Sequence, residues 1–214
     1  MNGDPKERVR ARLARHEPLT VPDVVPRDRR IDTGVLVPLT FDPVPTVTLV
    51  VRAGKLREHA GEVGFPGGKP EDVDADLAGT ALREAHEEIG LPPDAVEILG
   101  SLSPIPVATS RYRIHPFVGW VAKRPAAWRL SGEVARAVDL PLEAIASGVI
   151  AYEAVEMSWA GHEIQAPFFR LDDDTRLYGA SAFVLVELMA VVGPAWGFEL
   201  PLPVLRRDGP YGRS

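Results

Sequence analysis

Apolar and polar residues alternate along several stretches of this 214-residue chain, and such alternation is typical of strands with one buried face. β-branched residues dominate the two earliest stretches, 33–40 (TGVLVPLT) and 46–52 (TVTLVVR). Later stretches of similar character, broken by prolines and glycines, are also predicted to be strands: 97–107, 112–122, 133–140, 151–160 and 162–171. The pattern therefore predicts a protein in which strands dominate.

Three segments have helical character instead. The first, 4–16 (DPKERVRARLARH), begins with Asp4 as an N-cap and Pro5 in the first turn. The second, 77–90 (LAGTALREAHEEIG), is expected to end at Gly90, because glycine readily adopts the left-handed conformation of a C-terminal cap. The third, 178–192 (YGASAFVLVELMAVV), is apolar on almost every side, which predicts a buried helix.

Few helices and no repeated strand–helix–strand spacing argue against a doubly wound parallel sheet. We therefore predict an α/β protein of the α+β type, with a mixed sheet between helices on both faces. A proline-rich connection separates the first helix from the first strand, so residues 1–30 are predicted to be an N-terminal helix and linker. Residues 31–193 would form one domain, and 194–214, rich in proline and arginine, a loosely ordered tail.

Composition limits the possible functions. The net charge of −6 argues against a nucleic-acid or anionic-membrane surface, because both partners favour broad positive fields. The chain has no cysteine, which excludes disulfides, thiolate metal sites and cysteine nucleophiles. No apolar run approaches the roughly 20 residues of a membrane helix, and the N-terminus lacks the apolar core of a secretion signal. We expect a cytoplasmic protein that does not bind membranes.

Three carboxylates gather on the helix predicted at 77–90. Glu84, Glu87 and Glu88 occupy positions i, i+3 and i+4, so their side chains leave one face of the helix. Arg83 precedes Glu87 by four residues and can pair with it, which leaves Glu84 and Glu88 facing outward together. Such a pair suits a hard divalent cation such as Mg²⁺, although a charged helix face is more often simply solvated.

The turn that precedes this helix favours the metal site over a solvated face. The sequence FPGG, residues 65–68, ends in two glycines, which permit backbone conformations and close approaches that other residues cannot make. Gly67 and Gly68 are therefore expected to direct a carbonyl toward the metal and to place amides near a phosphate.

Together the turn and the helix resemble the box of the Nudix hydrolases. That box is Gly, five residues, Glu, seven residues, Arg-Glu, an aliphatic, any residue, Glu-Glu, any residue, Gly, aliphatic. Its second half is matched by Arg83, Glu84, Ala85, Glu87, Glu88, Gly90 and Leu91. Its first half differs, because the loop from Gly68 is one residue too long and Ala75 stands where the first Glu is expected, flanked by Asp74 and Asp76.

The longer loop resembles the subfamily of Nudix enzymes that cleave coenzyme A. The preceding stretch is similar to an added motif of that subfamily, through Arg52, Leu56, His59, Gly61, Val63 and Phe65–Gly68. Looser similarity extends the resemblance over roughly residues 31–193. It implies a Nudix-type mixed sheet between helices, and metal-dependent hydrolysis of coenzyme A or a derivative to 3′,5′-ADP and 4′-phosphopantetheine or its acyl form.

The resemblance also implies roles for individual residues. Glu84 and Glu88 would ligate Mg²⁺ or Mn²⁺, and Glu87, held by Arg83, would bind a second ion or a metal-bound water. Glu62 and Glu133 are candidates for an additional base, with a solvated strand-edge position as the alternative for each. The spacing alone does not identify the general base or the number of metal ions.

Basic residues before the turn provide candidate contacts to the substrate. Coenzyme A carries a 3′-phosphate, and Arg52, Lys55 and Arg57 lie within six residues of one another just before the turn. The alternative is that they are solvated charges at a strand end. His59 is a further candidate for hydrogen bonding to substrate or backbone, whereas other histidines, His86, His115 and His162, are expected at solvent or core positions.

Two other functions remain open at this point. One is a Nudix hydrolase of another nucleoside diphosphate derivative such as ADP-ribose, and the other is a non-catalytic module that binds a nucleotide. The presence of all four charged residues of the second half of the box, Arg83, Glu84, Glu87 and Glu88, argues against a non-catalytic module. The absence of a glutamate at the first acidic position of the box argues for one. A small-molecule nucleotide is the expected partner, with a homodimer possible; the sequence leaves the preferred form of coenzyme A undetermined.

Overall fold

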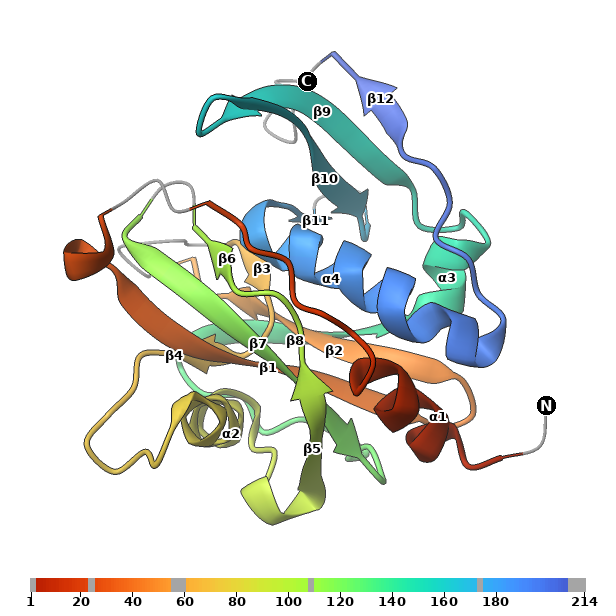
Figure 1. Ribbon diagram of the computed structural model, residues 1–214. Coiled ribbons are helices and arrows are strands. Elements are labelled where there is room, and N and C mark those ends of the chain that lie inside the picture. Colours follow the sequence, from red (N-terminus) through yellow and green to blue (C-terminus); the bar gives the residue numbers. More distant parts are fainter. Residues whose placement is uncertain (1–2, 23–25, 55–60, 108–109, 173–174, 208–214) are drawn as a thin grey trace.

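The larger of two β-sheets forms the centre of the protein (Figure 1). The computed structural model describes residues 3–22, 26–54, 61–107, 110–172 and 175–207. The central path of this sheet has the order β3-β2-β1-β7-β5, with β4 on β1, β6 on β7 and β8 on β2. Its strands are β1 Ile31–Phe41, β2 Pro45–Arg52, β3 Val63–Gly64, β4 Gly67–Gly68, β5 Val96–Ser101, β6 Ile105–Pro106, β7 Tyr112–Val121 and β8 Val134–Pro141.

The larger sheet is mixed, as the sequence predicted. Strands β1 and β7 run parallel over nine residue pairs, from Ile31 opposite Tyr112 to Leu39 opposite Trp120. The other neighbouring strands in this sheet are antiparallel. One parallel pair within an otherwise antiparallel sheet fits a chain that lacks repeated strand–helix–strand units.

The second sheet is smaller and lies on the other side of α4 from the larger sheet (Figure 1). It has the order β11-β10-β9-β12 and is built around the antiparallel hairpin of β9 and β10. Its strands are β9 Tyr152–Trp159, β10 His162–Arg170, β11 Arg176–Leu177 and β12 Val204–Arg206. The described part of the chain therefore holds two sheets, whereas the sequence indicated one.

In the part of the chain that the structure describes, four α-helices complete the layers. Their bounds are α1 Pro5–Leu13, α2 Leu77–Ile89, α3 Leu142–Ala146 and α4 Gly179–Val192; short 3-10 turns lie at Arg27–Arg29, Pro93–Ala95 and Gly193–Trp196. Helix α2 packs on one face of the larger sheet through β1, whereas α4 lies against the other face and also contacts β10 (Figure 1).

The alternation along β1 and β2 assigns each residue to one of two cores. Leu36 and Val50 are buried with Ala81, Ala85 and Ile89 of α2. The intervening residues of the same strands, among them Val35, Val37 and Leu49, pack with α1 and α4 in the larger core. Because successive strand residues point to opposite faces, the near-continuous apolar sequence of these strands is explained by burial on both sides.

The sequence located the long elements and one end of each of two helices, although the stretch predicted as one strand at 97–107 is divided into β5 and β6. Asp4 caps α1 by accepting a hydrogen bond from the Lys6 amide, and Gly90 closes α2 in the left-handed conformation, at φ 70°. Strand predictions missed β3, β4 and β11, because a two-residue segment has no detectable period. Among these are β3 and β4, which lie at the candidate site.

Helix α4 and the 3-10 turn after it, Gly179–Trp196, are long and apolar enough to cross a membrane by length and composition. This corrects the expectation that no apolar run approaches that length. In the structure, α4 lies between the two sheets and buries Val184, Leu185, Leu188 and Met189 completely. Burial from opposite sides accounts for its nearly uniform apolar sequence.

Part of the segment expected to be loosely ordered is a strand. Residues Val204–Arg206 form β12, which pairs in parallel with β9. The carboxylate of Glu153 on β9 is fully buried and pairs with both Arg170 on β10 and Arg206 on β12. A buried carboxylate requires partners of opposite charge, so Glu153 ties the strand of the tail to the second sheet.

Candidate active site

Helix α2 lies unusually close to the larger sheet, and glycines make that approach possible. A Cβ atom on Gly34 of β1 would stand 2.1 Å from the carbonyl oxygen of Leu77, in the first turn of α2. A Cβ atom on Gly68 of β4 would stand 2.1 Å from Oε1 of Glu84. Gly34 and Gly68 are register partners, so two glycines leave room for the helix backbone and for one carboxylate.

The loop between β4 and α2 is fixed by Asp74. Its carboxylate accepts two hydrogen bonds from Arg83, from Nε at 3.0 Å to Oδ1 and from Nη2 at 3.1 Å to Oδ2. The Thr80 hydroxyl and the Glu71 amide also donate to Oδ2, each at 2.9 Å. Hydrogen bonds from Arg83, reinforced by the Glu71 amide, lower the pKa of Asp74 to about 2, despite a side chain that is only 4% exposed.

This network identifies the acid that the sequence left ambiguous. Asp74 makes the paired contacts with Arg83, whereas Asp76 caps α2 by accepting a hydrogen bond from the Gly79 amide at 2.8 Å. Ala75, at the expected position, has no carboxylate to offer. The longer loop thus brings an aspartate to Arg83, and Nη2 of Arg83 also binds the Lys69 carbonyl at 2.9 Å.

Arg83 also contacts two of the three glutamates. Its Nη1 lies 3.2 Å from Oε2 of Glu87 and 3.2 Å from Oε1 of Glu84. The pair of Arg83 and Glu87 predicted from their spacing is confirmed. Glu87 is 56% exposed and points toward solvent, whereas Glu84 is largely covered by the loop and β4.

Glu88 is the most deeply placed carboxylate of the helix, at 7% exposure. Its Oε2 accepts a hydrogen bond from the Gly67 amide at 3.3 Å, and its Oε1 lies 3.7 Å from Nη1 of Arg52. Burial raises its pKa to about 7; Arg52 opposes that shift, and the nearby negative charge of Glu84 adds to it. Burial raises the pKa of Glu84 in the same way, against the effect of Arg83.

These two carboxylates suit a divalent cation. They are hard oxygen donors one helical turn apart, both held against the backbone of β4, and burial raises the pKa of each. In the ranges that the structure describes, no three His, Cys, Asp or Glu side chains form a ready-made metal cluster. Mg²⁺ commonly uses one or two carboxylates and completes its shell with water and substrate phosphates, so Glu84 and Glu88 suffice.

Arg52 lies at the end of β2, between acids. Besides Glu88, its guanidinium approaches Glu133 at 4.0 Å. The register of β2 and β8 shifts between Val51 and Arg52, and such irregularities commonly redirect a side chain beside an active site. Arg52 was predicted to contact substrate; the structure adds contacts with two carboxylates, which the sequence could not reveal because β8 is about 80 residues away.

The other predicted residues are placed as follows. Glu133 is 63% exposed, and Glu62 precedes β3, where its carbonyl accepts a hydrogen bond from the Arg52 amide at 2.9 Å. Lys55, Arg57 and His59 lie outside the described residues. His86 and His162 are exposed, as expected, and a third histidine, His115, hydrogen-bonds to Asp32 at 2.8 Å.

One pair of residues near the site was missed by the sequence analysis. The Nζ atom of Lys69, directly after Gly68, lies 5.0 Å from the centre of the Tyr112 ring at the start of β7. The distance is that of a cation–π contact. No local pattern connects residues so far apart in sequence; the position of Lys69 after two glycines was the available signal for a cation at this edge.

Comparisons with known proteins agree with this geometry. The family model described as "NUDIX domain" matches residues 30–157. The "Uncharacterized Nudix hydrolase NudL" of Cronobacter sakazakii is 35% identical over 163 residues, which cover 75% of this chain and 82% of that protein. The protein of the same name from Pectobacterium atrosepticum is 38% identical over 122 residues, covering 57% of this chain and 63% of the relative.

A solved structure supports the fold alone. The MutT/nudix family protein from Enterococcus faecalis superposes with a TM-score of 0.52 over 82% of this chain and 66% of that chain, at 14% identity. The family match spans the larger sheet and α2, which carries the three glutamates.

Proposed function

The chain belongs to the Nudix family, and from this premise we propose that it hydrolyses the pyrophosphate bond of coenzyme A or a derivative, using Mg²⁺ or Mn²⁺. The observation that carries the proposal is a pair of carboxylates held against Gly67 and Gly68, that of Glu88 buried and that of Glu84 partly buried. The products are 3′,5′-ADP and 4′-phosphopantetheine or its acyl form. Its place of action is the cytoplasm.

Each charged residue of the box has a different proposed role. Glu84 and Glu88 would hold the cation, which when bound supplies positive charge to the pyrophosphate oxygens and polarises a water. Arg83 holds the loop through Asp74 and the Lys69 carbonyl, so the glycine turn stays in place over the two carboxylates. Glu87, exposed and paired with Arg83, is available to orient a water or a second ion.

The reaction is a displacement at phosphorus. The water oxygen forms a bond to one phosphorus, the anhydride bond on its opposite side breaks, and the leaving phosphate takes the electron pair. The water gives its proton to a carboxylate, for which Glu62 and Glu133 are the proposed acceptors. Glu133 is supported by its contact with Arg52, which also approaches Glu88.

Preference for coenzyme A is supported by the basic residues that precede the turn. The 3′-phosphate requires a cation away from the metal, and Arg52, Lys55 and Arg57 belong to the stretch that resembles the coenzyme A subfamily. Lys69 provides a further cation at the glycine turn, and the half-buried ring of Tyr112 beside it offers a flat apolar surface.

The test is an analysis of products. Purified protein is incubated with Mg²⁺ and coenzyme A, ADP-ribose or a dinucleoside polyphosphate, and the products are separated, with Glu88→Gln as the matched inactive control. We expect 3′,5′-ADP from coenzyme A at the highest kcat/KM. Faster cleavage of another substrate would replace coenzyme A while retaining the hydrolase, and binding without cleavage of any substrate would favour the non-catalytic module.

A further inference from the structure

The cations of α1 fall into two groups with different surroundings. Lys6 and Arg10 point toward β5, where both pair with Glu97. Arg8, Arg12 and Arg15, spaced by four and three residues, line a different side of the same helix and the turn after it. Within the described residues, none of these three arginines forms an ion pair with a carboxylate.

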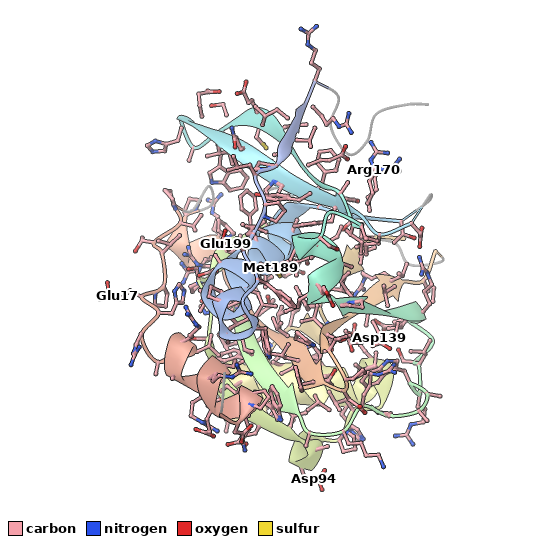
Figure 2. The ribbon with its side chains drawn as sticks, turned by 90° about the vertical axis from the view of Figure 1, so that its right-hand side faces the viewer. Glu17, Asp94, Asp139, Arg170, Met189 and Glu199 are labelled. Carbon is pink, nitrogen blue, oxygen red and sulfur yellow. The ribbon has the colours of Figure 1, made fainter. Side chains whose placement is uncertain are left out.

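These arginines border a cavity of about 640 Å³ between α1 and the C-terminal end of α4. Figure 2 faces the side of the molecule on which α1 and this end of α4 lie, and direct contacts join the two helices. The opposite wall is apolar and consists of Ala190, Val191, Pro194 and Ala195. We call this cavity, with Arg8, Arg12 and Arg15 on one wall and those four residues on the other, the arginine groove.

The acid on α4, the helix that forms the opposite wall of the arginine groove, already has hydrogen-bond partners. Glu187 is the single charged residue of α4, and its carboxylate binds His16 at 2.7 Å and accepts a hydrogen bond from the Ser103 amide at 3.0 Å. The Nε atom of Arg8 is buried and has no hydrogen-bond partner in the described part of the chain. A buried donor without a partner costs free energy, so the packing of α1 alone does not account for Arg8.

Cations in the last turn of a helix stabilise its dipole, and this effect accounts for Arg12. It requires no cavity, and it does not explain Arg8, which lies in the first half of α1 with its Nε buried. Among the described residues, three guanidinium groups without a carboxylate partner line one groove of a protein of net charge −6, and this arrangement favours an anionic ligand.

We propose that the arginine groove binds an organic anion that carries a phosphate or pyrophosphate group. Guanidinium groups bind phosphate oxygens through paired hydrogen bonds, and three of them match a ligand with at least two negative charges. The apolar wall suits a carbon-rich part of the ligand, and the volume is typical of small-molecule sites. α1 packs on the face of the larger sheet opposite α2, so this site is separate from Glu84 and Glu88 and does not depend on the proposed function.

Inorganic pyrophosphate in excess EDTA is the probe, because chelation prevents metal-mediated binding at Glu84 and Glu88. Binding is measured by calorimetry for the full chain and two double variants. Arg12→Gln with Arg15→Gln removes two exposed groove cations. Lys6→Gln with Arg10→Gln removes the same charge from the other side of the same helix and is the matched control.

We expect the groove variant to bind pyrophosphate at least about tenfold more weakly and the control variant to change by less than about twofold. Ala190→Glu, which places a negative charge on the exposed part of the opposite wall, is expected to weaken binding as well. Equal weakening of pyrophosphate binding in both double variants would show that binding depends only on the net charge of the protein. That result would overturn the proposal. Unchanged binding in the groove variant would also overturn it.

A second arm identifies the source of the phosphate. Sedimentation with phosphatidylcholine vesicles, with and without phosphatidic acid, tests a lipid headgroup. Binding restricted to phosphatidic acid vesicles and lost in Arg12→Gln with Arg15→Gln supports the groove with a headgroup as ligand. Pyrophosphate binding without vesicle binding supports a soluble ligand, and failure to bind either probe refutes the site.

Discussion

Replacing Gly68 by alanine isolates the contribution of a single carboxylate. The three heavy atoms nearest to the added Cβ would all belong to the Glu84 carboxyl group, at 2.1, 2.4 and 2.9 Å. Gly68 does not have a positive φ, so alanine meets no backbone strain at this position. The clash involves only the end of a flexible side chain, so Glu84 can turn away while the fold is retained.

The size of the effect follows from these distances. Ordinary contact requires more than 3 Å, so the Glu84 carboxylate must move by about 1 Å or more, and displacement of a catalytic group by 1 Å typically costs about a hundredfold in rate. We expect Gly68→Ala to lower kcat/KM by about that factor, and to weaken Mn²⁺ binding measured by electron paramagnetic resonance. The second readout does not depend on the identity of the substrate.

Gly79→Ala is the matched control in the same segment. Gly79 lies in the first turn of α2. Its added Cβ atom would stand 3.6 Å from Oδ1 of Asp76, which is an ordinary van der Waals distance. Alanine should stabilise the helix by roughly 0.5–1 kcal/mol and leave activity unchanged. The reasoning would be refuted if folded Gly68→Ala retained Mn²⁺ affinity and activity within about threefold of the original protein.

Three further predictions concern other residues of the site. Glu88→Gln keeps the size and the hydrogen bond from Gly67 but removes the charge, so it should nearly abolish turnover in a protein with unchanged circular dichroism; full activity in excess chelator would contradict the metal requirement. Asp74→Asn should destabilise the protein at neutral pH. Because folding lowers the pKa of Asp74 to about 2, its contribution is present above about pH 4 and lost as the pH falls toward 2. The difference in urea midpoint between the two proteins should therefore shrink over that range, and a constant difference would exclude the Asp74 charge as its cause. Arg57→Ala should raise KM for coenzyme A by about ten- to hundredfold and leave dephospho-coenzyme A nearly unchanged; equal losses on both would exclude a 3′-phosphate contact.

Local signals were sufficient for the long elements and for the helix that carries the site. The N-cap of α1, the C-cap of α2 and the apolar pattern of β1 and β2 depend on residues close together in the chain, which a sequence displays directly. The spacing of Arg83 and Glu87 fixed their contact in the same way.

The parts that sequence reasoning missed depend on contacts between distant segments. The first acid could not be assigned, because two aspartates, Asp74 and Asp76, flank the expected position and only the folded loop brings Asp74 to Arg83. The burial of Glu88 depends on the close approach of α2 to β4, which two glycines on separate strands permit. The contact between Lys69 and Tyr112 likewise requires the assembled sheet.

Hydrolysis by this site depends most directly on where a divalent cation binds. A crystal soaked in Mn²⁺ and measured at a wavelength with manganese anomalous signal would locate the ion without any assumption about the substrate. We predict an anomalous peak within coordination distance of both Glu84 and Glu88, beside Gly67 and Gly68. A fully occupied manganese ion that contacts neither carboxylate would contradict the account.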